Sequence, residues 1–177
     1  QGAFVGVYAP NMYLVSGDKR AVVIDTAYGK DDEVQALLES WEAHGKPELA
    51  GIVLTHRHGD HIGGAIRLQD STGATVICST TEEAPIREAL KGTPEVKTVG
   101  DGETLDLGGT TLEFIDVPGH TVGSICIYMQ EERVLFTGDT ILGVGSTVVS
   151  PDHGDMTSYM ASLGKLLNYD SRIICPG

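Results

Sequence analysis

The sequence reads Thr55-His56-Arg57-His58-Gly59-Asp60-His61 directly after the apolar run Gly51-Ile52-Val53-Leu54. Three of the chain's six histidines fall in this run, which disfavours a chance histidine-rich loop. Neutral imidazole and carboxylate are the ligands that zinc and similar divalent ions prefer. On an extended strand end, His56, His58 and Asp60 would project to the same side, and His61 would break that alternation. The run therefore predicts metal ligands that two neighbouring ions can share.

Two later segments have the same form, a strand followed by a ligand-type residue beside a glycine. They are Val117-Pro118-Gly119-His120-Thr121 and Phe136-Thr137-Gly138-Asp139-Thr140. A strand end presents one polar group in each, and the glycine allows a close turn of the backbone. Alone, His120 is typical of a structural histidine and Asp139 of a turn residue. Together with the histidine run, they are predicted to be further ligands.

These motifs resemble those of the metallo-beta-lactamase superfamily. Its pattern is H-x-H-x-D-H, then a histidine after a glycine, an aspartate in a G-D loop and a last histidine near the end. The resemblance extends over nearly the whole chain, because Asn11-x-Tyr13-Leu14-Val15 and Ile24-Asp25-Thr26 look like the family's opening strands. It implies an α+β fold, a four-layer αββα sandwich of two mixed sheets with outer helices. Residues 1–177 are then expected to form a single catalytic domain.

Carried over position by position, the resemblance implies two zinc ions, with Mn²⁺ or Fe²⁺ as alternatives. His56, His58 and His120 would bind the first ion. Asp60 and His61 would bind the second, and Asp139 would bridge both ions. A hydroxide shared by two such ions is a nucleophile at neutral pH, because the metals lower its pKa.

Two carboxylates are expected to do more than hold metal. Asp60 can orient the nucleophile and pass its proton onward, and with Asp139 it is a predicted catalytic residue. Asp25 is expected outside the ligand set, holding a ligand histidine or its loop. The family's last histidine would follow Cys175-Pro176-Gly177, so the sequence is expected to be truncated just before that ligand.

The ligand types favour one branch of the family. The best-known zinc beta-lactamases carry a cysteine where Asp139 stands, and the diiron flavoproteins carry a glutamate at the position of His58. What remains is the glyoxalase-II-like branch, and the segments at 136–146, 155–163 and 174–177 resemble the beta-lactamase-like protein 2 group. Gly143-Val144-Gly145-Ser146 lacks the spacing of a phosphate-binding loop and is expected to flank the site. His153 is expected to be an exposed turn residue, with substrate contact as the alternative.

We therefore expect a hydrolase that cleaves a small ester or thioester. The alternative is a metal-dependent endoribonuclease, and a beta-lactamase or a metal-binding scaffold without turnover is less favoured. The net charge of −13 argues against general binding of nucleic acid. The substrate and the oligomeric state stay open.

Composition and cysteine usage indicate an ordinary globular domain. The chain has 177 residues, 41% of them hydrophobic, and no apolar run of the ~20 residues needed to cross a bilayer. Cys78, Cys126 and Cys175 are an odd number without metal-site spacing, so they are expected to be buried free thiols of a cytoplasmic protein. Because the chain begins at Gln1 without Met, a removed leader is compatible with the sequence.

Hydrophobic periodicity and turn residues predict the secondary structure. Asp31 or Asp32 is expected to cap the first helix, Asp155 to cap the last, and His44 to lie at a helix end. A two-residue turn is expected at Gly108-Gly109. Strands are predicted at 4–8, 12–15, 21–25, 49–54, 75–78 and 172–175, hairpins at 104–117 and 124–137, and helices at 31–44, 62–69, 82–90 and 156–167.

Overall fold

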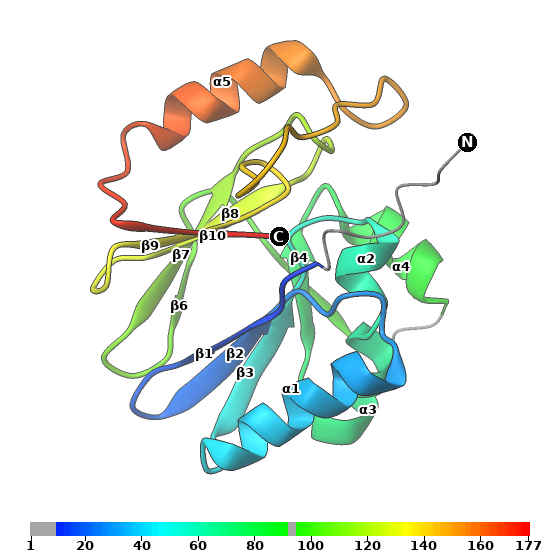
Figure 1. Ribbon diagram of the computed structural model, residues 1–177, viewed down its shortest axis with the longest axis vertical. Helices are drawn as coiled ribbons and strands as arrows, with labels where there is room; N and C mark the ends of the chain where they lie inside the picture. Colours follow the sequence, from blue (N-terminus) through cyan, green and yellow to red (C-terminus); the bar gives the residue numbers. More distant parts are fainter. Residues whose placement is uncertain (1–9, 92–94) are drawn as a thin grey trace.

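The computed structural model describes residues 10–91 and 95–177. It has two β-sheets packed face to face, with helices on both outer surfaces (Figure 1). This arrangement confirms the predicted αββα sandwich. The strand predicted at residues 4–8 lies outside the described residues.

The first sheet has the strand order β1-β2-β3-β4-β5. β1 and β2 are antiparallel, and the other neighbouring strands are parallel. β5 was not predicted, because its four residues alternate without a strong apolar signal. The strands span Tyr13–Ser16 (β1), Arg20–Ile24 (β2), Glu48–Val53 (β3), Val76–Ser79 (β4) and Val96–Val99 (β5).

The second sheet has the order β10-β9-β8-β7-β6, with β10 parallel to β9 and the remaining pairs antiparallel. The predicted turn between β6 and β7 is confirmed. Gly108 and Gly109 have φ of 83° and 74°, as a type I′ turn requires. The strands span Thr104–Asp106 (β6), Thr111–Asp116 (β7), Ile125–Met129 (β8), Val134–Gly138 (β9) and Ile173–Pro176 (β10).

Three apolar clusters hold the layers together. The cluster between the sheets includes Ile24 and Val53 from one sheet and Phe114 and Ile127 from the other. A second cluster joins the first sheet to its helices, and a third joins the second sheet to α5. Burial of this apolar surface is the main driving force for the fold.

Helices cover the outside of both sheets (Figure 1). Lys30, not Asp31 or Asp32, is the N-cap of α1, because its backbone N–H donates to Glu33 Oε2 at 2.9 Å. Asp155 caps α5 as predicted, and His44 is the C-cap of α1. The helices span Asp31–Ala43 (α1), Gly59–Ile62 (α2), Ala65–Thr72 (α3), Glu83–Leu90 (α4) and Met156–Leu166 (α5).

The histidine run does not continue β3 as an extended strand, so that part of the prediction is wrong. The strand ends at Val53, and His58 is the N-cap of the short helix α2. Asp60 therefore lies in a helical turn, and His56 and Asp60 do not share one face of a strand. Within the described residues, no helix is both long and apolar enough to span a membrane.

Candidate metal centre

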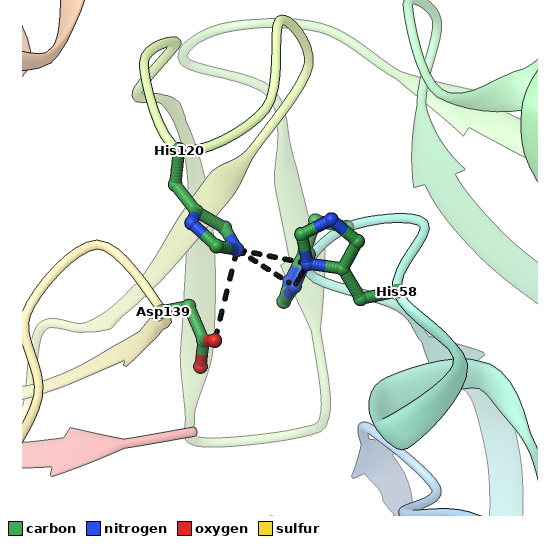
Figure 2. A group of neighbouring side chains, drawn as sticks. His58, His120 and Asp139 are labelled. Carbon is green, nitrogen blue, oxygen red and sulfur yellow. Dashed lines mark hydrogen bonds and ion pairs between the residues drawn. The ribbon is translucent and has the colours of Figure 1, made fainter. Parts of the chain in front are cut away.

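Three loops, each at the end of a strand, bring four ligand-type side chains together. His56 and His58 follow β3, His120 lies between β7 and β8, and Asp139 directly follows β9. One ligand atom from each side chain lies within 4.8 Å of those of the other three. Figure 2 shows His58, His120 and Asp139 pointing toward one another from separate loops.

Two of these loops depend on glycine. Gly119, before His120, has a φ of 149°, and a Cβ atom there would lie 2.3 Å from the Cα of Tyr159. Gly138, before Asp139, has a φ of 46°, and a Cβ atom would lie 2.6 Å from Thr55 Oγ1. Both glycines therefore allow a close approach that any other residue would block.

The hydrogen bonds of His56 and His120 leave a free nitrogen lone pair on each ring. Thr55 Oγ1 donates its only hydrogen to Asp25 Oδ2 at 2.8 Å, so it must accept from His56 Nδ1 at 3.0 Å. His120 Nδ1 lies 2.7 Å from the carbonyl of Val148, which can only accept. In the neutral rings, both Nε2 atoms are therefore unprotonated, although they lie only 3.2 Å apart.

His58 completes this convergence. Its Nδ1 lies 3.0 Å from His56 Nε2 and 2.9 Å from His120 Nε2. Burial and then the neighbouring rings hold the pKa of His56 well below its ordinary value and also lower the pKa of His58. The unprotonated Nε2 atoms of His56 and His120 repel each other unless a proton or a cation lies between them. This donor set therefore fits a divalent metal ion.

His61 and Asp139 form a second donor pair beside the first group. His61 Nδ1 lies 2.7 Å from Asp25 Oδ2, and its Nε2 lies 3.3 Å from Asp139 Oδ1. Burial opposes a charge on His61, but Asp25 and Asp139 outweigh it and raise its pKa to about 10. Asp139 Oδ2 lies 3.6 Å from His120 Nε2. The two oxygens of Asp139 thus face different histidines, an arrangement that suits a carboxylate shared by two cations.

Asp25 contacts both the loop and a histidine of the candidate site. Its Oδ1 accepts from the backbone N–H of Thr55 at 2.8 Å, and its Oδ2 faces His61. Asp25 is buried and has a φ of 57°, a conformation that aspartate adopts more readily than most residues. This contact fixes the orientation of the His61 ring, so that its Nε2 faces Asp139.

Asp60 is not a member of the four-residue group. It lines a cavity of about 370 Å³ together with His61, Asp139 and Gly177. A Cβ atom added at Gly177 would lie 2.6 Å from His61 Cε1 and 2.7 Å from Asp139 Oδ1. β10 therefore brings Gly177 against the second donor pair, at the cavity wall.

A buried carboxylate that the sequence analysis did not identify joins two of the ligand loops. Glu82 is fully buried. It accepts a hydrogen bond at 2.7 Å from Nε of Arg57, the residue between His56 and His58 in the sequence. It also accepts from Thr121 Oγ1 at 2.6 Å and from Gly123 N at 3.2 Å, next to His120. No motif in the sequence distinguishes Glu82 from the neighbouring Glu83.

His153 was also misjudged from the sequence. It lies in a turn, as expected, but it is half-buried and its Nε2 is 2.9 Å from His58 Nε2. The expectation of an exposed histidine is therefore wrong. The contact links residues 95 positions apart, so no local pattern could predict it.

Curated proteins of related sequence include three with informative names. A beta-lactamase-like protein 2 homolog from Caenorhabditis elegans is 34% identical over 171 residues, 94% of this chain and 55% of the relative. An atrochrysone carboxyl ACP thioesterase from Aspergillus fumigatus is 32% identical over 171 residues, which cover 94% of this chain and 50% of the relative. A hydroxyacylglutathione hydrolase from Ectopseudomonas mendocina is 33% identical over 127 residues, which cover 72% of this chain and 44% of the relative. The chain spans about half the length of these relatives.

Structural comparison agrees with the sequence relatives. The solved structure of TTHA1623 in a di-iron-bound form matches with a TM-score of 0.78 and 25% identity, covering 98% of this chain and 89% of that chain. The sequence profile described as the Metallo-beta-lactamase superfamily matches residues 5–177. By fold, motifs and sequence, the chain belongs to the metallo-beta-lactamase superfamily.

Proposed function

We propose that this chain is the catalytic part of a metal-dependent hydrolase that cleaves a small-molecule thioester or ester. The observation that carries the proposal is the convergence of three imidazole nitrogens and a carboxylate beside a cavity. Relatives named a thioesterase and a hydroxyacylglutathione hydrolase support this class of substrate.

We propose two ions, held as the family pattern implies. His56, His58 and His120 would hold the first, His61 and Asp60 the second, and Asp139 would contact both. When bound, the ions supply Lewis-acid chemistry, which lowers the pKa of a water molecule and polarises the scissile carbonyl. Zinc suits these nitrogen and oxygen ligands. Iron is the alternative, because TTHA1623 was solved in a di-iron-bound form.

A further histidine directly after Gly177 stays a prediction. Because Gly177 lies against His61 and Asp139, a residue joined to it would begin beside the second donor pair. The backbone N–H of Gly177 donates to the Gly138 carbonyl at 2.8 Å, which holds Gly177 beside the loop of Asp139.

The reaction needs a proton to move from water to the leaving group. The water oxygen forms a bond to the acyl carbon, the C–S bond breaks, and the products are a carboxylic acid and a thiol. Asp60 lines the same cavity as Asp139, which supports a role for its carboxylate in accepting the proton and passing it to the departing sulfur. His56 and His61 are buried and held by hydrogen bonds, which keeps the donor atoms in place during the reaction.

No specific observation favours a ribonuclease. Phosphodiester substrates are normally bound by Lys and Arg, and neither residue type occurs among the cavity-lining residues within 10–91 and 95–177. The net charge of −13 also repels polyanions. We therefore propose the thioester or ester class alone.

The test is hydrolysis of acyl-thioesters by the purified protein before and after chelation. We expect chelation to abolish turnover, and Zn²⁺, Mn²⁺ or Fe²⁺ added back singly to restore it. The ion that restores the highest rate identifies the preferred metal. Turnover that is indifferent to chelation, or no hydrolysis by any metal-loaded form, would overturn the proposal.

A further inference from the structure

The cavity beside the candidate metal centre has two chemically different walls. Asp60, His61 and Asp139 form one wall. A second part of the lining comes from the loop Leu142–Ser146, with Leu142 half-buried and Val144 65% exposed. The metal side is thus polar and ionisable, whereas the loop contributes two apolar side chains, two glycines and the uncharged Ser146.

All charge in the cavity lies on the metal side. Apart from Asp60, His61 and Asp139, every described residue that lines the cavity is uncharged, and none of them is Lys or Arg. A carboxylate or phosphate bound against the loop Leu142–Ser146 would lose hydration without gaining a cationic partner. It would also approach a protein with a net charge of −13.

We infer that the acyl group bound in this cavity is uncharged and apolar, and that Leu142 and Val144 determine this specificity. The inference rests on the proposed function and names its substrate class. A volume of about 370 Å³ is enough for on the order of ten non-hydrogen atoms, if each takes roughly the 30 Å³ of a liquid water molecule. A medium-length acyl chain therefore fits, with its thioester carbonyl toward His61 and Asp139.

A matched pair of substrates tests the inference. The hexanoyl and adipoyl thioesters of N-acetylcysteamine differ only at the far end, where adipoyl carries a carboxylate in place of a methyl group. We expect kcat/KM of the metal-loaded protein to be at least about tenfold higher for hexanoyl, because the carboxylate finds no partner in the cavity. Equal rates, or a preference for adipoyl, would overturn the inference.

Variants assign the preference to the loop. Val144→Lys places a cation at the cavity rim, at a position exposed enough to leave the fold intact. This variant should lower the ratio of kcat/KM for hexanoyl to kcat/KM for adipoyl by at least about threefold. Met160→Lys is the matched control, because Met160 is 60% exposed on α5 and does not line the cavity. It should leave the ratio at the wild-type value, whereas the same narrowing in both variants, or in neither, would contradict the role of Val144.

Binding separates failure of this inference from failure of the proposed function. The corresponding thioethers, S-hexyl and S-(5-carboxypentyl) N-acetylcysteamine, cannot be hydrolysed, and titration calorimetry measures their affinity directly. We expect the S-hexyl compound to bind at least about tenfold more tightly. Tighter binding of the S-hexyl compound without thioester turnover would refute the proposed hydrolase function, but it would support the preference of the cavity for an uncharged apolar group. Tighter binding of the carboxylated compound would refute the preference, whatever the turnover.

Discussion

The two sides of the candidate site are built in opposite ways. On the histidine side, His56 and His120 are buried, and each ring has a hydrogen bond that fixes its orientation. On the cavity side, Asp60 and Leu142 are half-buried and Val144 is exposed. The difference indicates that the histidine side fixes the ligand geometry, whereas the cavity side can change with the substrate at little cost to the fold.

The rigid histidine side contains a buried charged group that must be stabilised by hydrogen bonds. Glu82 is fully buried, and it is stable there because Arg57, Thr121 and Gly123 all donate to it. One carboxylate thereby connects the loop of His56 and His58 to the loop of His120. Removing any part of this network should affect several ligands at once.

The largest expected effect comes from removing a ligand on the histidine side. His120→Ala should lower kcat/KM for an acyl-thioester by at least about 10³-fold, because it removes one of three converging nitrogen donors. Steady-state kinetics at saturating Zn²⁺ measures the loss. His44→Ala is the control, since His44 lies at the end of α1 and its Nδ1 contacts only Ser40 among the described residues. Equal rates for the two variants would show that His120 is not a ligand.

Removing the buried carboxylate should have the next largest effect, on stability. Glu82→Ala leaves the Arg57 guanidinium, the Thr121 hydroxyl and the Gly123 N–H without their acceptor, and should lower the free energy of unfolding by about 3–5 kcal/mol. Glu83→Ala removes only a half-exposed pair with Arg87 and should cost less than about 1 kcal/mol. Urea denaturation compares the two variants, and similar losses of stability would show that the buried Glu82 network does not stabilise the histidine side of the site.

Asp60 tests the cavity side. Asp60→Asn keeps the shape of the side chain but removes its charge, so kcat should fall about 10²-fold or more while the free energy of unfolding changes by less than about 0.5 kcal/mol. Asp70→Asn, at an exposed position of α3, should change neither quantity. A stability loss in Asp60→Asn as large as that of Glu82→Ala would place Asp60 with the buried network instead.

The smallest expected effect is a difference in thiol labelling. Cys78 and Cys126 are fully buried, and burial is the main cause that raises the pKa of each to about 12. Cys175 is only half-buried on β10, next to the cavity residues Pro176 and Gly177, so the expectation of a buried thiol is wrong for this cysteine. Ellman's reagent should therefore label Cys175 in the folded protein, slowly, and all three thiols only in urea. Labelling of Cys78 at the rate of Cys175 would contradict the rigidity of the core.

Much of the fold could be predicted because its signals are local. Glycine and proline mark the turns, and apolar-rich segments such as Ile52–Leu54 and Leu112–Val117 mark buried strands. The candidate ligands were identified because each follows a strand, and strand ends bring loops from distant parts of a chain together. The roles assigned to His56, His120 and Asp139 stay predictions until metal binding is measured.

The contacts that support the ligands could not be predicted, because they depend on tertiary structure. Glu82 reaches Arg57 and Thr121 from another part of the chain, and His153 reaches His58 across 95 positions. The N-cap of α1 was misassigned for a different reason. Aspartate in general favours the N-cap position, which is why Asp31 was chosen. In the structure, however, the backbone N–H of Lys30 donates to Glu33, and the helix starts one residue earlier than a cap at Asp31 would allow.

Metal content per chain tests the central claim most directly. The purified protein is equilibrated with Zn²⁺, freed of unbound metal by gel filtration and analysed by elemental mass spectrometry beside His120→Ala and His44→Ala. The account predicts at least one tightly held ion per chain in the wild type and in His44→Ala, and its loss in His120→Ala. No bound ion in the wild type, or the same metal content in all three proteins, would contradict it.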